Sequence, residues 1–272
     1  SPDTKSRMTE YEKWSILLTK QAVKELAEKN RIDFGSIDRI ITISCTGFFA
    51  PGLDYELIKE FSISPSVKRT NIGFMGCAAS LVGINSVWEA MNQNFSENIL
   101  MVSVELCSLH LQTEPTRDNI LANMIFADGA AAAYFSITNI SNKKKLAIQL
   151  AESFLFQDSA KFMGWKIGNN GFEMMLSSDL PKIILNSAAP RAKEILVQKG
   201  IDISAIKHWA LHPGGRAILD SLQNGLELSD EQLKPSREVL RNFGNLSSVS
   251  ILFVLKNLLE NDIKPSDIMT RK

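Results

Sequence analysis

The sequence has few cysteines, no surplus of charge of either sign and no long apolar run. Its 272 residues contain 30 Lys+Arg against 30 Asp+Glu, so the formal net charge is zero. Nucleic-acid binding and acidic solvating tails each need a surplus of one sign, so neither is expected here. The apolar runs stay below about 18 residues, the length of a membrane-spanning helix. We therefore expect no nucleic-acid partner and no membrane span.

The three cysteines exclude two further classes of protein. Cys45, Cys77 and Cys107 form no Cys-x-x-Cys pair and no Cys/His ligand spacing, so a zinc site is not expected. Three is an odd number, and the chain is far longer than a disulfide-stapled scaffold, which favours a reducing, cytoplasmic compartment. Cys45 and Cys107 lie in or beside apolar stretches, and we expect both to be inert packing residues.

The two ends of the sequence also lack expected features. It begins with SPDTKSRMTE, which has neither an initial Met nor a signal peptide, and it stops at DIMTRK without a terminal element. We expect the chain to be truncated at both ends.

Helical and strand patterns alternate along the chain, which contains 44% hydrophobic and 22% charged residues, an ordinary globular composition. Apolar residues at helical spacing predict a helix over 8–29, and near-continuous apolar runs predict buried strands over 37–43 and 98–106. Further helices are predicted over 51–61, 78–92, 181–200, 215–226 and 248–261, and further strands over 129–138 and 206–212. This alternation argues for an α/β fold with a largely parallel sheet.

An internal repeat relates the two halves of the chain. Ile32-Asp33 recurs as Ile201-Asp202, at an offset of 169 (201 − 32), ahead of a predicted strand in each half. Gly76-Cys77 falls on Gly244-Asn245 at an offset of 168 (244 − 76), ahead of a predicted apolar helix. No linker rich in Pro, Gly or Ser separates the copies, so we expect the halves to pack tightly together.

The repeat gives three polar residues related places. Cys77 and Asn245 each open a helix, and His212 ends a strand, where ligands bind in open α/β sheets. A helix N-terminus stabilises a thiolate, and a nearby imidazole adds to this effect. Taken alone, a small-residue stretch around Cys77 is more often packing, but together the three residues favour a nucleophile. Asn245 is then either an N-cap or, beside His212, an oxyanion-hole donor.

These residues lie in stretches that resemble the type III polyketide synthases, the chalcone synthase-like branch of the thiolase superfamily. The matching stretches are GFMGCAAS around Cys77, LHPGGRAILD around His212, NFGNLSSVSILFVL around Asn245, FADGAAA and SCTGFFAPGLDYEL. The resemblance covers nearly all of the chain. It implies a thiolase-like layered αβαβα fold made of two similar packed halves. The nucleophile half would span residues 1–140, and the half with His and Asn would span 141–272, with its C-terminus incomplete.

The same resemblance implies roles for individual residues. Cys77, His212 and Asn245 would form the catalytic triad. Phe126 falls on a family gatekeeper that is Phe, and Met174 falls on the position of a second one. The remaining positions that it implies for substrate binding are Ser44, Thr46, Gly214 and Ala217.

The implied activity is that of an acyltransferase. It would load a starter acyl-CoA on Cys77 and extend it by decarboxylative Claisen condensation with malonyl-CoA, as a homodimer and without any metal or redox cofactor. Two alternatives stay open. One is a ketoacyl synthase III-like enzyme that uses acyl carrier protein, although HPGG and GNLSS favour the CoA-using branch. The other is a degenerate, non-catalytic partner subunit, against which the intact triad argues. A thiolase would need a second late cysteine, and none follows Cys107.

Overall fold

A four-stranded sheet forms the centre of the molecule. The computed structural model describes residues 2–93, 97–137 and 145–263. The strands are β1 (Arg39–Ser44), β2 (Lys68–Gly73), β3 (Ile99–Leu106) and β4 (Asp128–Phe135), in the order β2-β1-β3-β4. β1 pairs in parallel with β2 and β3, whereas β4 runs antiparallel to β3. The expectation of a largely parallel sheet is therefore confirmed, with one antiparallel edge strand.

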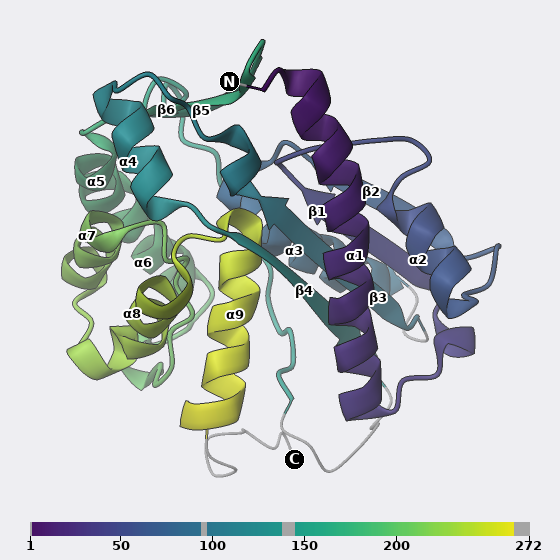
Figure 1. Ribbon diagram of the computed structural model, residues 1–272. Helices are drawn as coiled ribbons and strands as arrows, with labels where there is room; N and C mark the ends of the chain where they lie inside the picture. The colour runs from purple at the N-terminus through teal and green to yellow at the C-terminus, as the bar shows by residue number, and fades with distance from the viewer. Residues whose placement is uncertain (1, 94–96, 138–144, 264–272) are drawn as a thin grey trace.

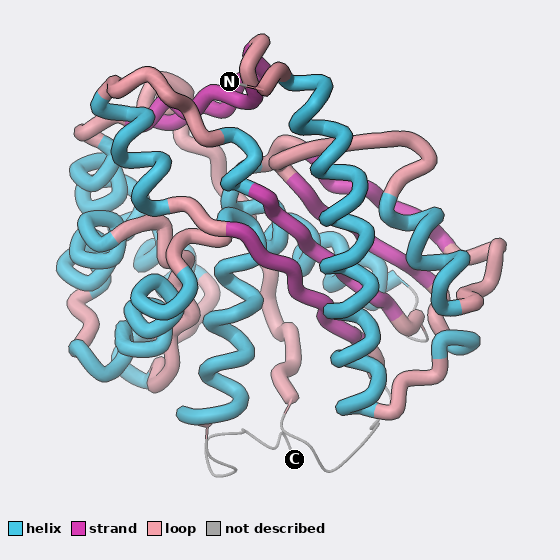
Figure 2. The backbone as a smooth tube through the Cα atoms, in the orientation of Figure 1, coloured by secondary structure: helices cyan, strands magenta, loops and turns pink. Residues whose placement is uncertain are grey.

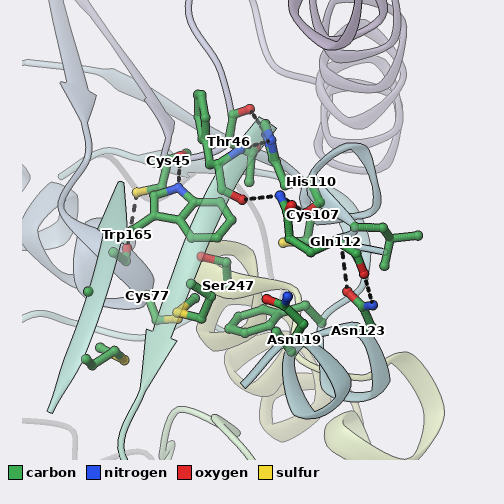
Figure 3. A pocket seen from close by; sticks show the side chains of 18 of the residues that line it. Cys45, Thr46, Cys77, Cys107, His110, Gln112, Asn119, Asn123, Trp165 and Ser247 are labelled. Atoms are coloured by element: carbon green, nitrogen blue, oxygen red, sulfur yellow. Dashed lines mark hydrogen bonds between the residues drawn. The ribbon is translucent and has the colours of Figure 1, made fainter. Parts of the chain in front are cut away.

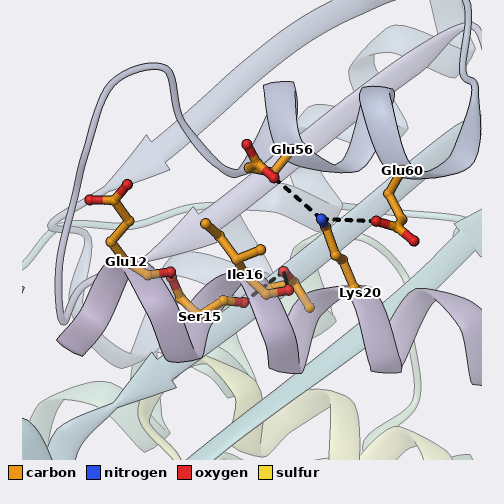
Figure 4. A network of polar contacts seen from close by, with 7 residues as sticks. Glu12, Ser15, Ile16, Lys20, Glu56 and Glu60 are labelled. Atoms are coloured by element: carbon orange, nitrogen blue, oxygen red, sulfur yellow. Dashed lines mark hydrogen bonds and ion pairs between the residues drawn. The ribbon is translucent and has the colours of Figure 1, made fainter. Parts of the chain in front are cut away.

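Two helices cover one face of this sheet (Figure 1). They are α1 (Thr4–Asn30) and α2 (Leu53–Phe61). Val23 of α1 and Leu57 of α2 pack with Ile40 of β1 in one buried cluster. The two helices are also joined at the surface, because the Nζ atom of Lys20 lies 3.3 Å from Glu56 and 2.9 Å from Glu60 (Figure 4).

The other face of the sheet packs against α3 (Ala79–Gln93) and α9 (Ser250–Asn257). Ile41 of β1 and Met101 of β3 form a second core there with Val87 of α3 and Ile251 of α9. Because β1 and β3 are covered on both faces, their sequences are near-continuously apolar instead of alternating.

Helices make up most of the C-terminal half of the described chain (Figures 1 and 2). They are α5 (Leu180–Ile183), α6 (Ala189–Gln198), α7 (Arg216–Leu226) and α8 (Asp230–Phe243), together with α9. The helix predicted over 181–200 is broken by a π turn, Ile184–Ala188, just before Pro190, which has no N–H to donate. The strand predicted over 206–212 is not formed, since no described strand pairs with this segment.

Two strands form a separate antiparallel hairpin, β5 (Met163–Gly168) and β6 (Gly171–Leu176). The helix α4 (Arg117–Ile125) lies beside β6. The sequence patterns predicted neither the hairpin nor α4. The predicted boundary between the halves, at residue 140, lies outside the described residues, and the two-domain division stays a prediction.

The repeat is visible in short 3₁₀ turns. Asp33 and Asp202 each cap such a turn. Asp33 Oδ1 accepts the N–H of Gly35 and Asp202 Oδ1 accepts the N–H of Ser204, both at 2.9 Å. At the N-terminal ends of α3 and α9, the matching 3₁₀ turns do not begin at the residues that the sequence repeat pairs. The turn Gly76–Ala78 leads into α3 and the turn Ser247–Val249 leads into α9, and their first residues have φ of 62° and 50°.

The first residues of those two turns lie 171 apart (247 − 76), whereas Gly76 and Gly244, which both have a positive φ, keep the expected offset of 168. Asn245 lies two residues before its turn, so the exact register of the repeat stays a prediction. Within the described ranges, no helix is both long and apolar enough to cross a membrane.

Candidate active site

A cavity of about 240 Å³ lies where the C-terminal ends of β1 and β3 meet the turns that lead into α3 and α9 (Figure 3). Ligand sites in α/β folds are typically found at this edge of the sheet. All three cysteines of the chain line the cavity, among mostly apolar neighbours. Its lining residues are Cys45, Thr46, Phe74, Gly76, Cys77, Cys107, His110, Leu111, Gln112, Asn119, Ala122, Asn123, Phe126, Met163, Gly164, Trp165, Phe172, Met174 and Ser247.

Cys77 is the second residue of the turn that begins α3. Burial raises the pKa of its thiol to about 11, and the nearby Glu105 carboxylate adds to the rise. Hydrogen bonds from the side chains of Ser247 and Asn245 lower the pKa in part. The resting group is therefore a thiol at neutral pH. The sequence suggested a thiolate stabilised by the helix N-terminus. This stabilisation is too small, because the cost of desolvating the thiolate outweighs it.

Asn245 is fully buried and held from several sides. Its Oδ1 accepts the N–H of Ser247 at 2.9 Å, and its Nδ2 donates to the carbonyl of Gly214 at 3.2 Å. Its main chain bonds to the segment of the gatekeeper candidate: Asn245 N–H donates to the carbonyl of Ile125, and Ala127 N–H donates to the carbonyl of Asn245, both at 2.9 Å. The amide is thus fixed between the segment around Phe126 and the His-Pro-Gly-Gly turn.

His212 lies directly before that turn, and the N–H of Gly214 donates to its carbonyl at 2.9 Å. Both ring nitrogens are buried and have no hydrogen-bond partner within the described part of the chain. Burial lowers the pKa of His212 to about 4, so the imidazole is neutral at pH 7. The structure thus brings the Asn245 side chain to Cys77, and it places His212 two residues before Gly214, whose carbonyl binds the Asn245 amide. Neither His212 nor Asn245 is itself part of the cavity lining.

The six substrate-binding residues implied by the resemblance divide into two groups. Phe126, Met174 and Thr46 line the cavity. Ser44 lines a smaller space of about 50 Å³ between β1 and β2, and its hydroxyl pairs with that of Thr46 at 3.4 Å. Gly214 and Ala217 lie outside the lining, Gly214 as the acceptor of the Asn245 amide and Ala217 exposed in the first turn of α7. These assignments stay predictions.

A buried carboxylate connects the segments around Cys77. Glu105, near the end of β3, accepts hydrogen bonds from the N–H of Cys45 at 3.0 Å and from the hydroxyl of Thr46 at 2.9 Å. It also accepts from the hydroxyl of Ser248, in the turn that begins α9. Burial raises the pKa of Glu105. Cys45 and Cys107 are buried free thiols that line the cavity, and burial raises their pKa values as it does that of Cys77. Their role as inert packing residues stays a prediction.

Sequence reasoning missed the residues that form the wall opposite Cys77. His110 and Gln112 follow β3, and Trp165 and Phe172 lie in the hairpin. Their place in the cavity depends on where the hairpin packs, which is a tertiary contact. The one local signal was a buried strand that ends in a histidine-containing loop, SLHLQ.

Two sequence families match the chain. The family described as "FAE1/Type III polyketide synthase-like protein" matches residues 2–156, and "Chalcone and stilbene synthases, C-terminal domain" matches residues 147–271. The alpha-pyrone synthesis polyketide synthase-like protein Pks18 of Mycobacterium tuberculosis is 32% identical over 227 residues, which are 82% of this chain and 58% of that protein. The 1,3,6,8-tetrahydroxynaphthalene synthase of Streptomyces coelicolor is 31% identical over 82% of this chain and 59% of its own length. The chain thus spans less than two thirds of these relatives.

Solved structures give the same picture. PKS-I from the brown alga Ectocarpus siliculosus is 33% identical with a TM-score of 0.89, covering 94% of this chain and 68% of that one. The Streptomyces coelicolor tetrahydroxynaphthalene synthase has a TM-score of 0.87 at 28% identity, covering 97% of this chain and 75% of its own. These matches confirm the expected α/β, thiolase-like fold.

Proposed function

Because the chain belongs to the type III polyketide synthase family, we propose that it is an acyltransferase that extends a starter acyl-CoA on Cys77 with malonyl-CoA. One observation carries the proposal. The Cys77 thiol faces an apolar cavity at the ends of the parallel strands, with hydrogen bonds from the buried side chains of Asn245 and Ser247 beside it. An apolar cavity suits an acyl chain, and the polar groups beside the sulfur suit a thioester oxygen.

In the loading step, neutral His212 accepts the thiol proton while the sulfur of Cys77 attacks the thioester carbon of the starter acyl-CoA. The carbon–sulfur bond to CoA breaks, and the leaving CoA thiolate takes the proton back from His212. The acyl group stays on Cys77 as a thioester. A histidine whose pKa is lowered to about 4 returns its proton readily, and both of its ring nitrogens are without another partner in the described chain.

In the extension step, malonyl-CoA loses CO2, and the electron pair of the broken carbon–carbon bond becomes an enolate. His212 and Asn245 stabilise the enolate oxygen. A neutral imidazole carries one N–H. Of the two N–H groups of Asn245 Nδ2, one binds the Gly214 carbonyl and the other, which faces the sulfur of Cys77, can turn to the enolate oxygen. The enolate carbon then attacks the acyl thioester, and the Cys77 thiolate leaves. Since decarboxylation supplies the carbanion, we propose that no metal or redox cofactor takes part.

The assembly and the compartment form part of the same proposal. Phe48, Phe74, Met75 and Leu81 are exposed apolar side chains; Phe74 and Met75 directly follow the edge strand β2, and the Phe48 ring lies 6.3 Å from that of Phe74. Exposed apolar clusters and free strand edges are typical of contact surfaces between subunits. We propose that this surface forms a homodimer, and that the enzyme works in the reducing cytoplasm, where Cys77 stays a free thiol.

The test uses substitutions at the two groups that act first. Cys77→Ala should abolish acyl loading, measured by intact-mass spectrometry, and peptide mapping of the wild type should place the acyl group on Cys77 and not on Cys45 or Cys107. His212→Gln should abolish decarboxylation of malonyl-CoA, measured as released CO2, while His208→Gln serves as the matched control. Acyl loading retained by Cys77→Ala would sink the nucleophile assignment.

A further inference from the structure

The β5–β6 hairpin supplies one whole wall of the cavity, through Met163, Gly164, Trp165, Phe172 and Met174. It belongs to no larger sheet, because its two strands pair only with each other in the described structure. A two-stranded hairpin alone is marginally stable in water. The position of this wall must therefore be fixed by contacts outside the hairpin.

His110 makes the most direct of these contacts. Its Nδ1 accepts the N–H of Phe172 at 2.9 Å, and its Nε2 lies 2.6 Å from the carbonyl of Thr46, to which it donates. The tautomer follows from the partners, since a main-chain N–H needs an acceptor and a carbonyl needs a donor. The imidazole also stacks on the ring of Phe172, with ring centroids 4.0 Å apart and planes at 9°. One buried side chain thus joins β6 to the loop after β1.

Gln112 also binds β6, through main-chain carbonyls. Its Nε2 lies within hydrogen-bond distance of the carbonyls of Phe172 and Asn170, at 3.1 and 3.2 Å, and of His110 at 3.2 Å. Its main chain is paired with Asn123 of α4, whose Nδ2 donates to the Gln112 carbonyl at 2.9 Å. Figure 3 shows these bonds between Gln112 and Asn123 at the edge of the cavity.

Other hydrogen bonds also attach the hairpin. Trp165 Nε1 donates to the carbonyl of Cys45 at 2.8 Å, Asp118 of α4 accepts the N–H of Leu176 at 3.2 Å, and Thr4 binds the tip through Gly171. His110 and Gln112 both bond to the main chain of Phe172, near the start of β6, and Phe172 and Met174 of this strand line the cavity.

We infer that His110 and Gln112 are positioning residues that fix the β6 wall and thereby limit the length of the acyl group that the cavity accepts. Both nitrogens of His110 already have main-chain partners, so the imidazole is not available for proton transfer. Instead, His110 sets the distance between β6 and the loop that carries Cys45 and Thr46. This inference rests on the proposed function for its substrate, but the attachment itself can be measured without activity.

The experiment compares two substitutions at His110 in the full chain. His110→Leu keeps much of the volume but removes both hydrogen bonds. His110→Gln keeps them, because a glutamine amide offers one donor and one acceptor at a similar separation. Hydrogen exchange of the peptide 163–176 should accelerate roughly tenfold in His110→Leu, as expected for one lost buried hydrogen bond, and should stay near wild type in His110→Gln.

Activity gives the second readout, with a series of saturated acyl-CoA starters of increasing length. His110→Leu should raise kcat/KM for the longer starters relative to acetyl-CoA by about the same factor. Gln112→Met, at a half-buried position, is the milder second variant and should act in the same direction. Gln232→Met is the matched control, because Gln232 Nε2 donates to the carbonyl of Ile206 in the other half of the molecule.

Each outcome decides between the claims. Equal exchange in His110→Leu and wild type would overturn the positioning role. Fast exchange in both His110→Gln and His110→Leu would overturn its basis in hydrogen bonds, because ring packing would then hold the wall. An unchanged starter profile with faster exchange would overturn the limit on acyl length. A wild type that loads no acyl-CoA at all would refute the proposed function, while the exchange contrast would still report on the attachment.

Discussion

Acid should destabilise this protein through its two buried, neutral histidines, and His110 allows the effect to be isolated. Burial lowers the pKa of His110 from its ordinary value of 6.5 to about 4, and the charge of Arg7 adds to this, while the hydrogen bond to Thr46 opposes it. The unfolded chain binds a proton near pH 6.5, whereas the folded chain does not until about pH 4. The free energy of unfolding is therefore greatest above pH 6.5 and falls as the pH drops toward 4.

The size of this loss follows from the pKa difference. At 1.36 kcal/mol per unit, a difference of about 2.5 units corresponds to roughly 3 kcal/mol once the pH is below both values. Between pH 7 and 4.5 most of it is lost, about 2 kcal/mol for His110. His212, with the same pKa of about 4, should contribute a similar amount.

The assay is urea unfolding followed by circular dichroism at pH 7.0, 6.0, 5.0 and 4.5. His110→Gln has no titrating ring, so its free energy of unfolding should fall by about 2 kcal/mol less than that of the wild type over this range. Taking the difference cancels groups common to both proteins, including Glu105, whose raised pKa acts in the opposite direction. Identical losses in the two proteins would show that His110 is not held neutral by burial.

Two further predictions concern Cys77 and the assembly. Alkylation of Cys77 by iodoacetamide, followed by peptide mapping, should rise about tenfold per pH unit from pH 7 to 10, because its pKa is about 11; a plateau below pH 8 would contradict this. Met75→Lys together with Leu81→Lys should shift sedimentation velocity from a dimer to a monomer, because both charges would enter the proposed contact surface. An unshifted dimer would place the contact elsewhere.

The sequence was most informative where local pattern and tertiary burial coincide. β1 and β3 are covered by helices on both faces, so their apolar runs identified them directly. The segment 206–212 has the same apolar character, but no described strand lies beside it, and pairing is what makes an apolar run a strand. The helix α8 was missed, although Ser229 and Gln232 form a capping box at its start, because Pro235 lies inside it and weakens the pattern.

The site shows a similar division. Cys77, Asn245 and His212 could be selected from motifs, because their neighbours in sequence carry the signal. The hairpin wall could not, since the hydrogen bond and ring stacking between His110 and Phe172 join residues 62 positions apart in the chain. The sequence alignment of the two halves also did not predict where the two matching turns begin. Only the structure shows that the two 3₁₀ turns begin at Gly76 and at Ser247.

If Cys77 is the nucleophile as proposed, its raised pKa limits how it can be activated. Moving its proton to His212 means a transfer from a group with a pKa of about 11 to one with a pKa of about 4. Seven units correspond to about 10 kcal/mol before the attraction between the two new charges is counted. A preformed thiolate–imidazolium pair would thus be rare in the resting enzyme. Proton transfer and attack on the thioester should therefore occur together, at the moment when Asn245 and the neutral His212 can receive the developing charge.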